Sequence, residues 1–380
     1  MISTTYIQQY KIILSTFLIT ILLIFPKINI FDINNYWQGI RFENLISLFL
    51  LILIISSPKK FKINDGYKFY LFFSFIFLSY SVGFISNLSP NIIVLIRIIE
   101  YAVFIIYFTN TKLDYKKLIL IFKVIILINF VFSLLQYFDL VGFISSRGYY
   151  APNYAYSASA GIFSGSWESS FITSVLYFII YLNDKKKINL YLFLTLIILF
   201  LADTRGVLFP FFLSIFFLYK DKFKINISHL IILLLASYGF YFFILKYYAL
   251  DIFVLFESFV KLIIFNQNMF ADLTNLSNEY YSWAYRLVEW SRDATTFNTN
   301  IFTILFGTGY LKIYYESFLI RILFANGIIG LLVLFILSLR IKFYMIIFLL
   351  LSGITLDYVA SFKMFIVLFL YFKFVKLSGK

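Results

Sequence analysis

Long apolar runs recur along the whole chain, and they constrain its fold more than any other feature. Of 380 residues, 62% are hydrophobic and only 13% are charged. A soluble domain cannot bury that much apolar surface, so the sequence predicts an integral membrane protein. A helix needs about 20 apolar residues to cross the hydrocarbon core of a bilayer, and somewhat fewer with interfacial flanks. Backbone groups in lipid must be satisfied within the protein, so runs of this length predict helices.

Twelve runs meet this criterion, although a count of ten or eleven also fits the pattern. They lie at about 10–26, 42–57, 68–86, 91–109, 117–137, 168–182, 188–203, 206–219, 228–248, 316–338, 342–356 and 360–376. We therefore expect an all-α fold, a polytopic membrane helix bundle of about twelve transmembrane helices that forms one integral membrane domain over residues 1–380. The first run is interpreted as a membrane helix, because no small-residue cleavage site marks it as a signal peptide.

Lysine clusters follow every second span and predict the orientation of the chain. Lys59 and Lys60 follow the second span, and the three lysines at 185–187 follow the sixth. Positive residues are retained on the cytoplasmic side of a membrane, so both termini are expected to be cytoplasmic. The formal net charge of +14 is then largely a topology signal, and no basic soluble domain is left to bind nucleic acid. Two long segments, 138–167 and 249–315, fall on the outer side.

Ionisable residues outside the lysine clusters fall mostly on the predicted outer side. They are Arg97, Glu100, Glu168, Asp203, Arg205, Glu316, Arg321, Asp357 and Lys363. Only Lys123 lies toward the cytoplasmic end of its span, where its side chain can extend to the surface. Charges at membrane depth usually pair with one another or line a cavity. The one-sided distribution therefore predicts a polar pocket open to the outside and not a path through the bilayer.

Each of these charges also has a simpler interpretation. Arg97 and Glu100 are spaced i, i+3 and can neutralise each other. Asp203 and Arg205 bracket a tight turn, where a local pair is as good an interpretation as a ligand site. Near a second outside turn, at about 357–363, the two charged residues are expected to be solvated.

The segment 276–297 in the long outer loop has the pattern of an amphipathic helix. Trp283, Leu287 and Trp290 share one face, while Arg286 lies on another. Such a helix can lie on the bilayer surface with its aromatic rings at the level of the headgroups. It can equally hold the arginine over the outer pocket, with the tryptophan rings available to a sugar.

Several chemistries are missing from the sequence. It has no cysteine, no Asp-x-Asp pair to hold a metal–nucleotide, no Gly-rich phosphate loop and no His/Cys cluster with metal-ligand spacing. No metal site and no cofactor are therefore predicted. Arginines and carboxylates remain on the outer side, and that pairing suits the binding of a diphosphate and the removal of a proton from a hydroxyl.

Four places in the chain carry short motifs in a fixed order. They are "SAGIFSGSWESSF" at 159–171, "ADTRG" at 202–206, "YRLVEW" at 285–290 followed by "LFGTGY" at 305–310, and "ESFLIRILFANGIIG" at 316–330. Together they resemble the O-antigen polymerases (Wzy-type) and, more distantly, the O-antigen ligases, which share one membrane fold. The motifs cover about 155–335, and the rest is similar by span pattern only. Ligases begin the last motif with histidine, whereas Glu316 stands in that place here, and this favours a polymerase.

The resemblance implies a GT-C-like fold and a metal-independent glycosyltransferase at the periplasmic face of the bacterial inner membrane. Such an enzyme moves a growing chain from undecaprenyl diphosphate to a sugar hydroxyl of the next lipid-linked repeat unit. By the resemblance, Arg205 and Arg286 would meet the negative charge of the diphosphate, and Glu316 would act as the base or orient the acceptor. The expected partners are the undecaprenyl-diphosphate-linked oligosaccharide, membrane lipids and a chain-length regulator.

Further residues are expected to bind substrate on the same side. They are Arg321, Glu168, Arg147, Arg292, Arg97, Trp283 and Trp290. For Arg321, extension to the lipid headgroups is the alternative to phosphate binding. Three other functions compete with the polymerase: an O-antigen ligase, a capsule or exopolysaccharide polymerase, and a lipid-linked oligosaccharide flippase or transporter. A transporter should carry ionisable groups near mid-membrane and an internal repeat, which are not evident here.

Overall fold

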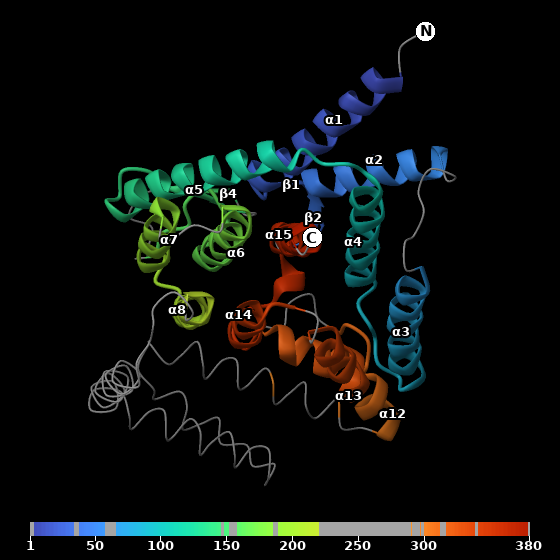
Figure 1. Ribbon diagram of the computed structural model, residues 1–380. Coiled ribbons are helices and arrows are strands. Elements are labelled where there is room, and N and C mark those ends of the chain that lie inside the picture. Colours follow the sequence, from blue (N-terminus) through green and yellow to red (C-terminus); the bar gives the residue numbers. More distant parts are fainter. Residues whose placement is uncertain are drawn as a thin grey trace, which may run out of the picture. The chain divides into compact units, whose positions relative to one another are not determined.

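The computed structural model is mainly helical over the part of the chain that it describes (Figure 1). The described residues are 4–33, 38–57, 66–145, 148–151, 158–184, 189–219, 290, 297, 300–311, 317–338 and 341–378. The helices are α1 (Thr4–Ile24), α2 (Phe42–Ser56), α3 (Gly66–Ile85), α4 (Ile92–Asn110), α5 (Tyr115–Tyr137), α6 (Ser166–Asp184), α7 (Leu190–Leu201), α8 (Arg205–Tyr219), α12 (Ile301–Phe306), α13 (Phe318–Ser338), α14 (Phe343–Gly353) and α15 (Phe362–Ser378), with the 3-10 helix η2 (Tyr358–Ala360).

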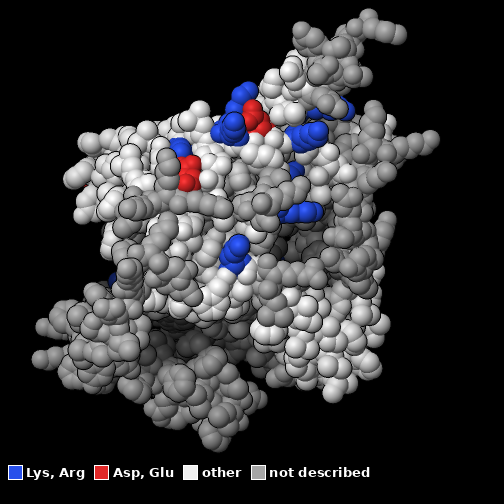
Figure 2. Space-filling model, viewed as in Figure 1, with Lys and Arg blue, Asp and Glu red and all other residues white. Residues whose placement is uncertain are grey.

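The first eight predicted spans correspond to α1 to α8, and the last three correspond to α13, α14 and α15. The ninth, at 228–248, lies outside the described residues. By length and composition, α4, α5 and the Phe318–Ile336 part of α13 can each cross a membrane, and the other apolar helices searched are shorter. Most of the described surface in Figure 2 is uncharged. These features support a helical membrane protein, while the twelve-span count, the GT-C-like fold and the orientation remain predictions.

Two short antiparallel hairpins, which the hydropathy pattern did not predict, interrupt the helices. Strands β1 (Asn29–Ile33) and β2 (Gln38–Arg41) form the first, and Asn29 pairs with Arg41 in its register. Strands β3 (Phe143–Ser145) and β4 (Gly148–Tyr150) form the second, inside the predicted 138–167 loop. The first hairpin joins α1 to α2 and brings the ends of these two helices together.

Residue contacts divide the chain into two compact units. The first comprises Met1–Ser74, Asn91–Phe212 and Phe348–Lys380, and the second comprises Phe75–Pro90 and Leu213–Ile347. In the first unit, α6 lies at the centre: α15, α5 and α7 pack on it, and Figure 1 shows α5 crossing over α6 and α7. Every residue of α6 from Glu168 to Ile180 is buried.

The helix ends of the first unit fall into two groups, according to the side of the membrane that the lysine pattern predicts for them. At one group of ends, the ammonium of Lys123 on α5 lies 2.8 Å from a carboxylate oxygen of Asp184 at the end of α6. In the same way, Lys373 near the end of α15 donates hydrogen bonds to the carbonyl oxygens of Phe108 and Thr111 at the end of α4, the latter at 3.0 Å. The lysine pattern places all of these ends on one side, so the contacts agree with alternating spans.

In the second unit, α13 is broken at Gly327, where the prediction was one continuous span. Gly327 has φ of 69°, outside the helical region. The "LFGTGY" segment after α12 docks at this break: the N–H of Thr308 donates to the carbonyl of Phe324 at 2.9 Å, and the N–H of Gly309 donates to that of Ala325 at 3.1 Å. Two motifs that lie apart in the sequence therefore form one structure, and the loop replaces the hydrogen bonds that the break removes.

Candidate functional site: a charged cluster at helix ends

Seven charged side chains of the first unit come together from six segments, and we call them the helix-end cluster. They are Lys27 after α1, Arg41 at the end of β2, Glu43 in the first turn of α2, Arg97 and Glu100 on α4, Glu168 in the first turn of α6, and Lys363 in the first turn of α15. The hairpin β1–β2 turns the chain back, so that Lys27 just before it and Arg41 at its end lie near each other beside the helices.

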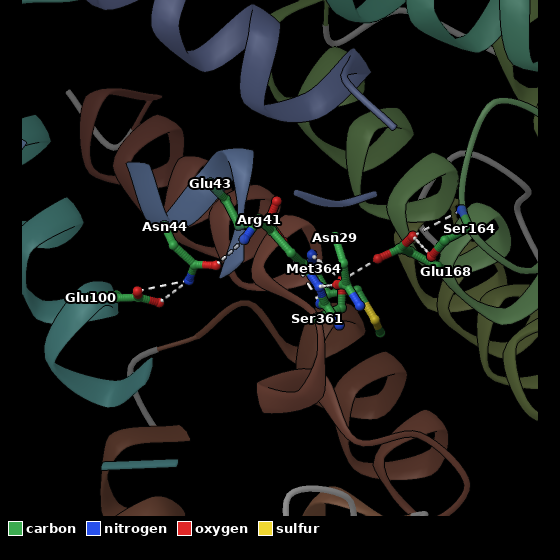
Figure 3. Close-up of polar contacts among 9 residues, drawn as sticks. All are labelled: Asn29, Arg41, Glu43, Asn44, Glu100, Ser164, Glu168, Ser361 and Met364. Carbon is green, nitrogen blue, oxygen red and sulfur yellow. Dashed lines mark hydrogen bonds and ion pairs between the residues drawn. The ribbon is translucent and has the colours of Figure 1, made fainter. Parts of the chain in front are cut away.

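Glu168 joins the first turns of α6 and α15 (Figure 3). Its carboxylate is fully buried and accepts hydrogen bonds from the backbone N–H of Ser164 at 3.1 Å and from the hydroxyl of Ser164 at 2.5 Å. The hydroxyl of Ser361 also donates to the carboxylate of Glu168. The hydroxyl oxygen of Ser361 in turn accepts a hydrogen bond from the backbone N–H of Met364 at 3.4 Å. Both carboxylate oxygens are therefore occupied by neutral donors, and the serine that begins α15 is held against α6.

Two lysines flank this carboxylate without a hydrogen bond to it. The ammonium of Lys27 lies over the ring of Trp167, 5.8 Å from its centroid, and that of Lys363 lies over Phe163 at 5.2 Å. Lys363 is only 5% exposed, and its ammonium has no hydrogen-bond partner among the described residues. Burial lowers the pKa of Lys27 to about 8, and the neighbouring Glu168 carboxylate opposes that shift.

Arg41 organises the other half of the cluster. Its Nε donates to the side-chain oxygen of Asn29 at 2.9 Å, its backbone N–H donates to that of Asn44 at 2.6 Å, and its guanidinium lies 3.8 Å from a carboxylate oxygen of Glu43. The amide nitrogen of Asn44 in turn donates to both carboxylate oxygens of Glu100, at 2.7 and 2.9 Å. This chain of contacts links the hairpin to α2 and α4 (Figure 3).

A small pocket opens in this half of the cluster. Its volume is about 10 Å³, counted as the space that the centre of a water molecule can occupy. This is room for roughly one water molecule or one ligand oxygen. The pocket is lined by Arg41, Glu43, Asn44, Arg97, Glu100, Tyr101, Ala360 and Phe362. Two of the lining residues flank Ser361, so the pocket adjoins the site of Glu168 and Lys363.

The structure brings together some of the residues predicted from the sequence and separates others. Arg97 and Glu168 belong to the helix-end cluster. Arg205 is exposed, and its Nε lies 3.8 Å from a carboxylate oxygen of Asp203. These two residues therefore form the local turn pair that was one of the two interpretations of their spacing. A hydrogen bond between Thr204 and Ser170 holds that turn against α6. Arg205 therefore lies near the same end of α6 as Glu168.

Other predicted residues fall elsewhere. Arg321, in the second unit, is fully buried with its guanidinium over the ring of Tyr310, 5.3 Å from the centroid. The interpretation that it extends to lipid headgroups is therefore wrong. Trp290 is helical and partly buried. Glu316, Arg286, Arg147, Arg292 and Trp283 lie outside the described residues, so the expected convergence of Arg205, Arg286 and Glu316 stays a prediction.

Two simpler interpretations are also corrected. Asp357 is fully buried and Lys363 nearly so, although both were expected to be solvated, because the segment that carries them packs against α6. Among the described residues, Glu100 bonds to Asn44, and no direct ion pair joins it to Arg97. The i, i+3 spacing alone could not reveal a polar partner on another helix.

Sequence reasoning missed Lys27, Arg41, Glu43 and Asn44. One signal was available, because Lys27 and Arg41 are basic residues between the first two spans, on the side that the lysine rule leaves poor in positive charge. Four cations against three carboxylates leave the cluster with one net positive charge, so an anion is the ligand that it can attract. No family model, curated protein or solved structure matches this chain.

Proposed function

We propose that this chain is an O-antigen polymerase, a membrane glycosyltransferase that uses lipid-diphosphate-linked oligosaccharides on the outer side of the membrane. One observation carries the proposal: in the described part of the first unit, buried and half-buried charges gather at those helix ends that the lysine pattern assigns to the outside. The four motifs that resemble the polymerase family support the same assignment. A site at one membrane face suits a transfer reaction better than transport, which needs a path through the bilayer.

The proposed reaction is a displacement at the anomeric carbon of the donor sugar. The acceptor hydroxyl oxygen forms the new glycosidic bond and gives its proton to Glu316. The bond between the anomeric carbon and the diphosphate oxygen breaks, and undecaprenyl diphosphate leaves with the electron pair. Arg205 and Arg286 would stabilise that leaving group, because a guanidinium donates two parallel hydrogen bonds and keeps its charge. The exposed side chain of Arg205 is free to turn from Asp203 to such a ligand.

The decisive experiment is complementation of a deletion strain, read as a silver-stained ladder of lipopolysaccharide. Loss of a polymerase leaves core with one repeat unit, loss of a ligase leaves bare core, and loss of a flippase leaves lipid-linked units inside the cell. Arg205→Ala, Arg286→Ala and Glu316→Gln should each give the one-unit pattern, since one positioned donor contributes on the order of 3 kcal/mol to the barrier and a general base about 10²- to 10⁴-fold in rate.

The matched control is Lys116→Met, which removes an exposed lysine at the other group of helix ends. It should restore a full ladder. Normal chain lengths in all three site variants, with protein levels equal to wild type, would reject the proposed catalytic residues. Bare core or internal retention in the deletion strain would reject the polymerase itself.

A further inference from the structure

The buried ammonium of Lys363 is the least satisfied group of the helix-end cluster. It has three hydrogen-bond donors, and none of them reaches an acceptor among the described residues. Placing an unpaired ammonium away from water is costly, because the charge loses its hydration and gains no partner. The aromatic ring of Phe163 compensates only part of this cost.

The carboxylates of the cluster do not supply the missing acceptor. The oxygens of Glu168 receive the donors of Ser164 and Ser361, and those of Glu100 receive the amide of Asn44. Lys27 has the same character: its ammonium lies over an aromatic ring, and no hydrogen bond or ion pair joins it to a described residue. A self-neutralising network would instead show ammonium groups in contact with carboxylates.

The two lysines lie near the same two carboxylates. The ammonium of Lys363 interacts electrostatically with Glu168 and Glu43, which come from two other helices. Lys27 interacts with the same two carboxylates and with Arg41 and Arg97. Glu43, Arg41 and Arg97 line the pocket, and Lys27 is only half-buried, so an anion can approach from its side.

We propose that the helix-end cluster binds the phosphate group of a membrane lipid, with Lys363 and Lys27 donating hydrogen bonds to its oxygens. A phosphate offers several acceptors to cations that arrive from different directions. The adjoining pocket, which Arg41 and Arg97 line and the two lysines do not, has room for one further oxygen. The cluster lies at the ends of apolar helices, where lipid headgroups are found. The proposal goes beyond the polymerase assignment and does not depend on it, since Arg205, Arg286 and Glu316 have no part in it.

Binding to the purified full-length protein in detergent tests this site. Farnesyl diphosphate and phosphatidylglycerol are the phosphate-bearing probes, and farnesol and diacylglycerol are the matched lipids without phosphate. Native mass spectrometry measures the bound fraction of each. We expect at least one phosphate-bearing probe to bind more tightly than its matched control. Binding of farnesyl diphosphate alone identifies a lipid diphosphate as the source, binding of phosphatidylglycerol alone identifies a phospholipid headgroup, and either result supports the site.

The variants Lys363→Met and Lys27→Met should each weaken that binding by about tenfold or more, because each removes a charge-assisted hydrogen bond. Lys363→Arg keeps the charge and should bind within about threefold of wild type. Lys116→Met, at the other helix ends, is the control and should bind as wild type. Size-exclusion profiles without lipid show whether each variant folds. If Lys363→Met does not fold, the Lys27→Met variant, which changes a half-buried residue, decides the test. Equal binding of probes with and without phosphate, or wild-type binding by Lys27→Met, would overturn the proposal.

Discussion

The break in α13 gives the sharpest test of the fold, through the substitution Gly327→Ala. Gly327 has φ of 69° and ψ of −172°, a combination that is essentially restricted to glycine. A Cβ atom added there would lie 2.3 Å from the carbonyl oxygen of Leu305 and 2.7 Å from the backbone nitrogen of Gly307. Neither neighbour is the movable end of a side chain, so the docked segment or the break itself must shift.

The expected cost follows from these contacts. An alanine in this backbone region costs about 1–3 kcal/mol. Displacement of the docked segment also removes the hydrogen bonds from Thr308 to Phe324 and from Gly309 to Ala325, each worth about 0.5–1.5 kcal/mol net. Together these effects destabilise the second unit by about 4 kcal/mol. For a chain of this size that loss corresponds to a fall of roughly 5–10 °C in the apparent melting temperature.

The assay is thermal unfolding of the purified protein in detergent, followed by tryptophan fluorescence. Gly353→Ala in α14 is the control, because Gly353 does not have a positive φ and the atom nearest to its added Cβ, the hydroxyl oxygen of Tyr358, is 3.2 Å away. That variant should melt within about 2 °C of wild type, since alanine suits a helix better than glycine does. If Gly327→Ala melts as high as the control, the helix is not broken at this residue and the reasoning fails.

Three further predictions concern the first unit and the orientation. Glu168→Ala should lower the stability of the first unit by about 3 kcal/mol, because the buried serine donors and the two lysines lose their carboxylate, and Glu168→Gln should cost less. Equal thermal stability of the Glu168→Ala variant and wild type would contradict this expectation. With the pKa of Lys27 lowered to about 8, its ammonium loses its proton as pH rises from 7 to 9, so binding of a phosphate-bearing probe should weaken over that window, and Lys27→Arg should flatten the dependence. The charged groups around that ammonium are Glu168 of α6, Arg41 of β2, Glu43 of α2 and Arg97 of α4. The chain has no cysteine, so a membrane-impermeant maleimide on spheroplasts should label Leu140→Cys and leave Lys116→Cys unlabelled, whereas the reverse pattern would invert the proposed orientation.

Hydropathy predicted the bounds of the helices closely, because the apolar character that it measures is the property that makes a segment a membrane helix. The span predicted at 42–57 is α2, Phe42–Ser56, and the span predicted at 117–137 is α5, Tyr115–Tyr137. Hydropathy contains no information on backbone dihedral angles. The run through Gly327 is apolar enough on average to be predicted as one span, despite Arg321 and Asn326, and the docked segment that makes the break tolerable comes from a distant part of the chain.

The site was harder to predict, because it depends on which helix ends meet. Arg97, Glu100, Glu168 and Lys363 were among the charges assigned to the outer side, and the structure gathers these four in the helix-end cluster, although Lys363 was expected to be solvated. Their partners did not follow from spacing: Glu168 meets Ser361 across 193 positions of sequence. A local sequence pattern cannot pair residues at that separation.

Helix polarity adds a reason to expect an anion at the helix-end cluster. The N-terminus of a helix carries partial positive charge and its C-terminus partial negative charge. Glu43 and Glu168 in first turns follow this rule, and so does Lys373, which donates to the last carbonyls of α4, whereas Lys116 and Arg205 lie in first turns but are exposed. Lys363 breaks it, because its ammonium lies in the first turn of α15 and is buried there without a hydrogen-bond acceptor among the described residues. A bound phosphate reverses the sign of the local charge and makes that position favourable, so the unfavourable placement is itself an argument for the ligand.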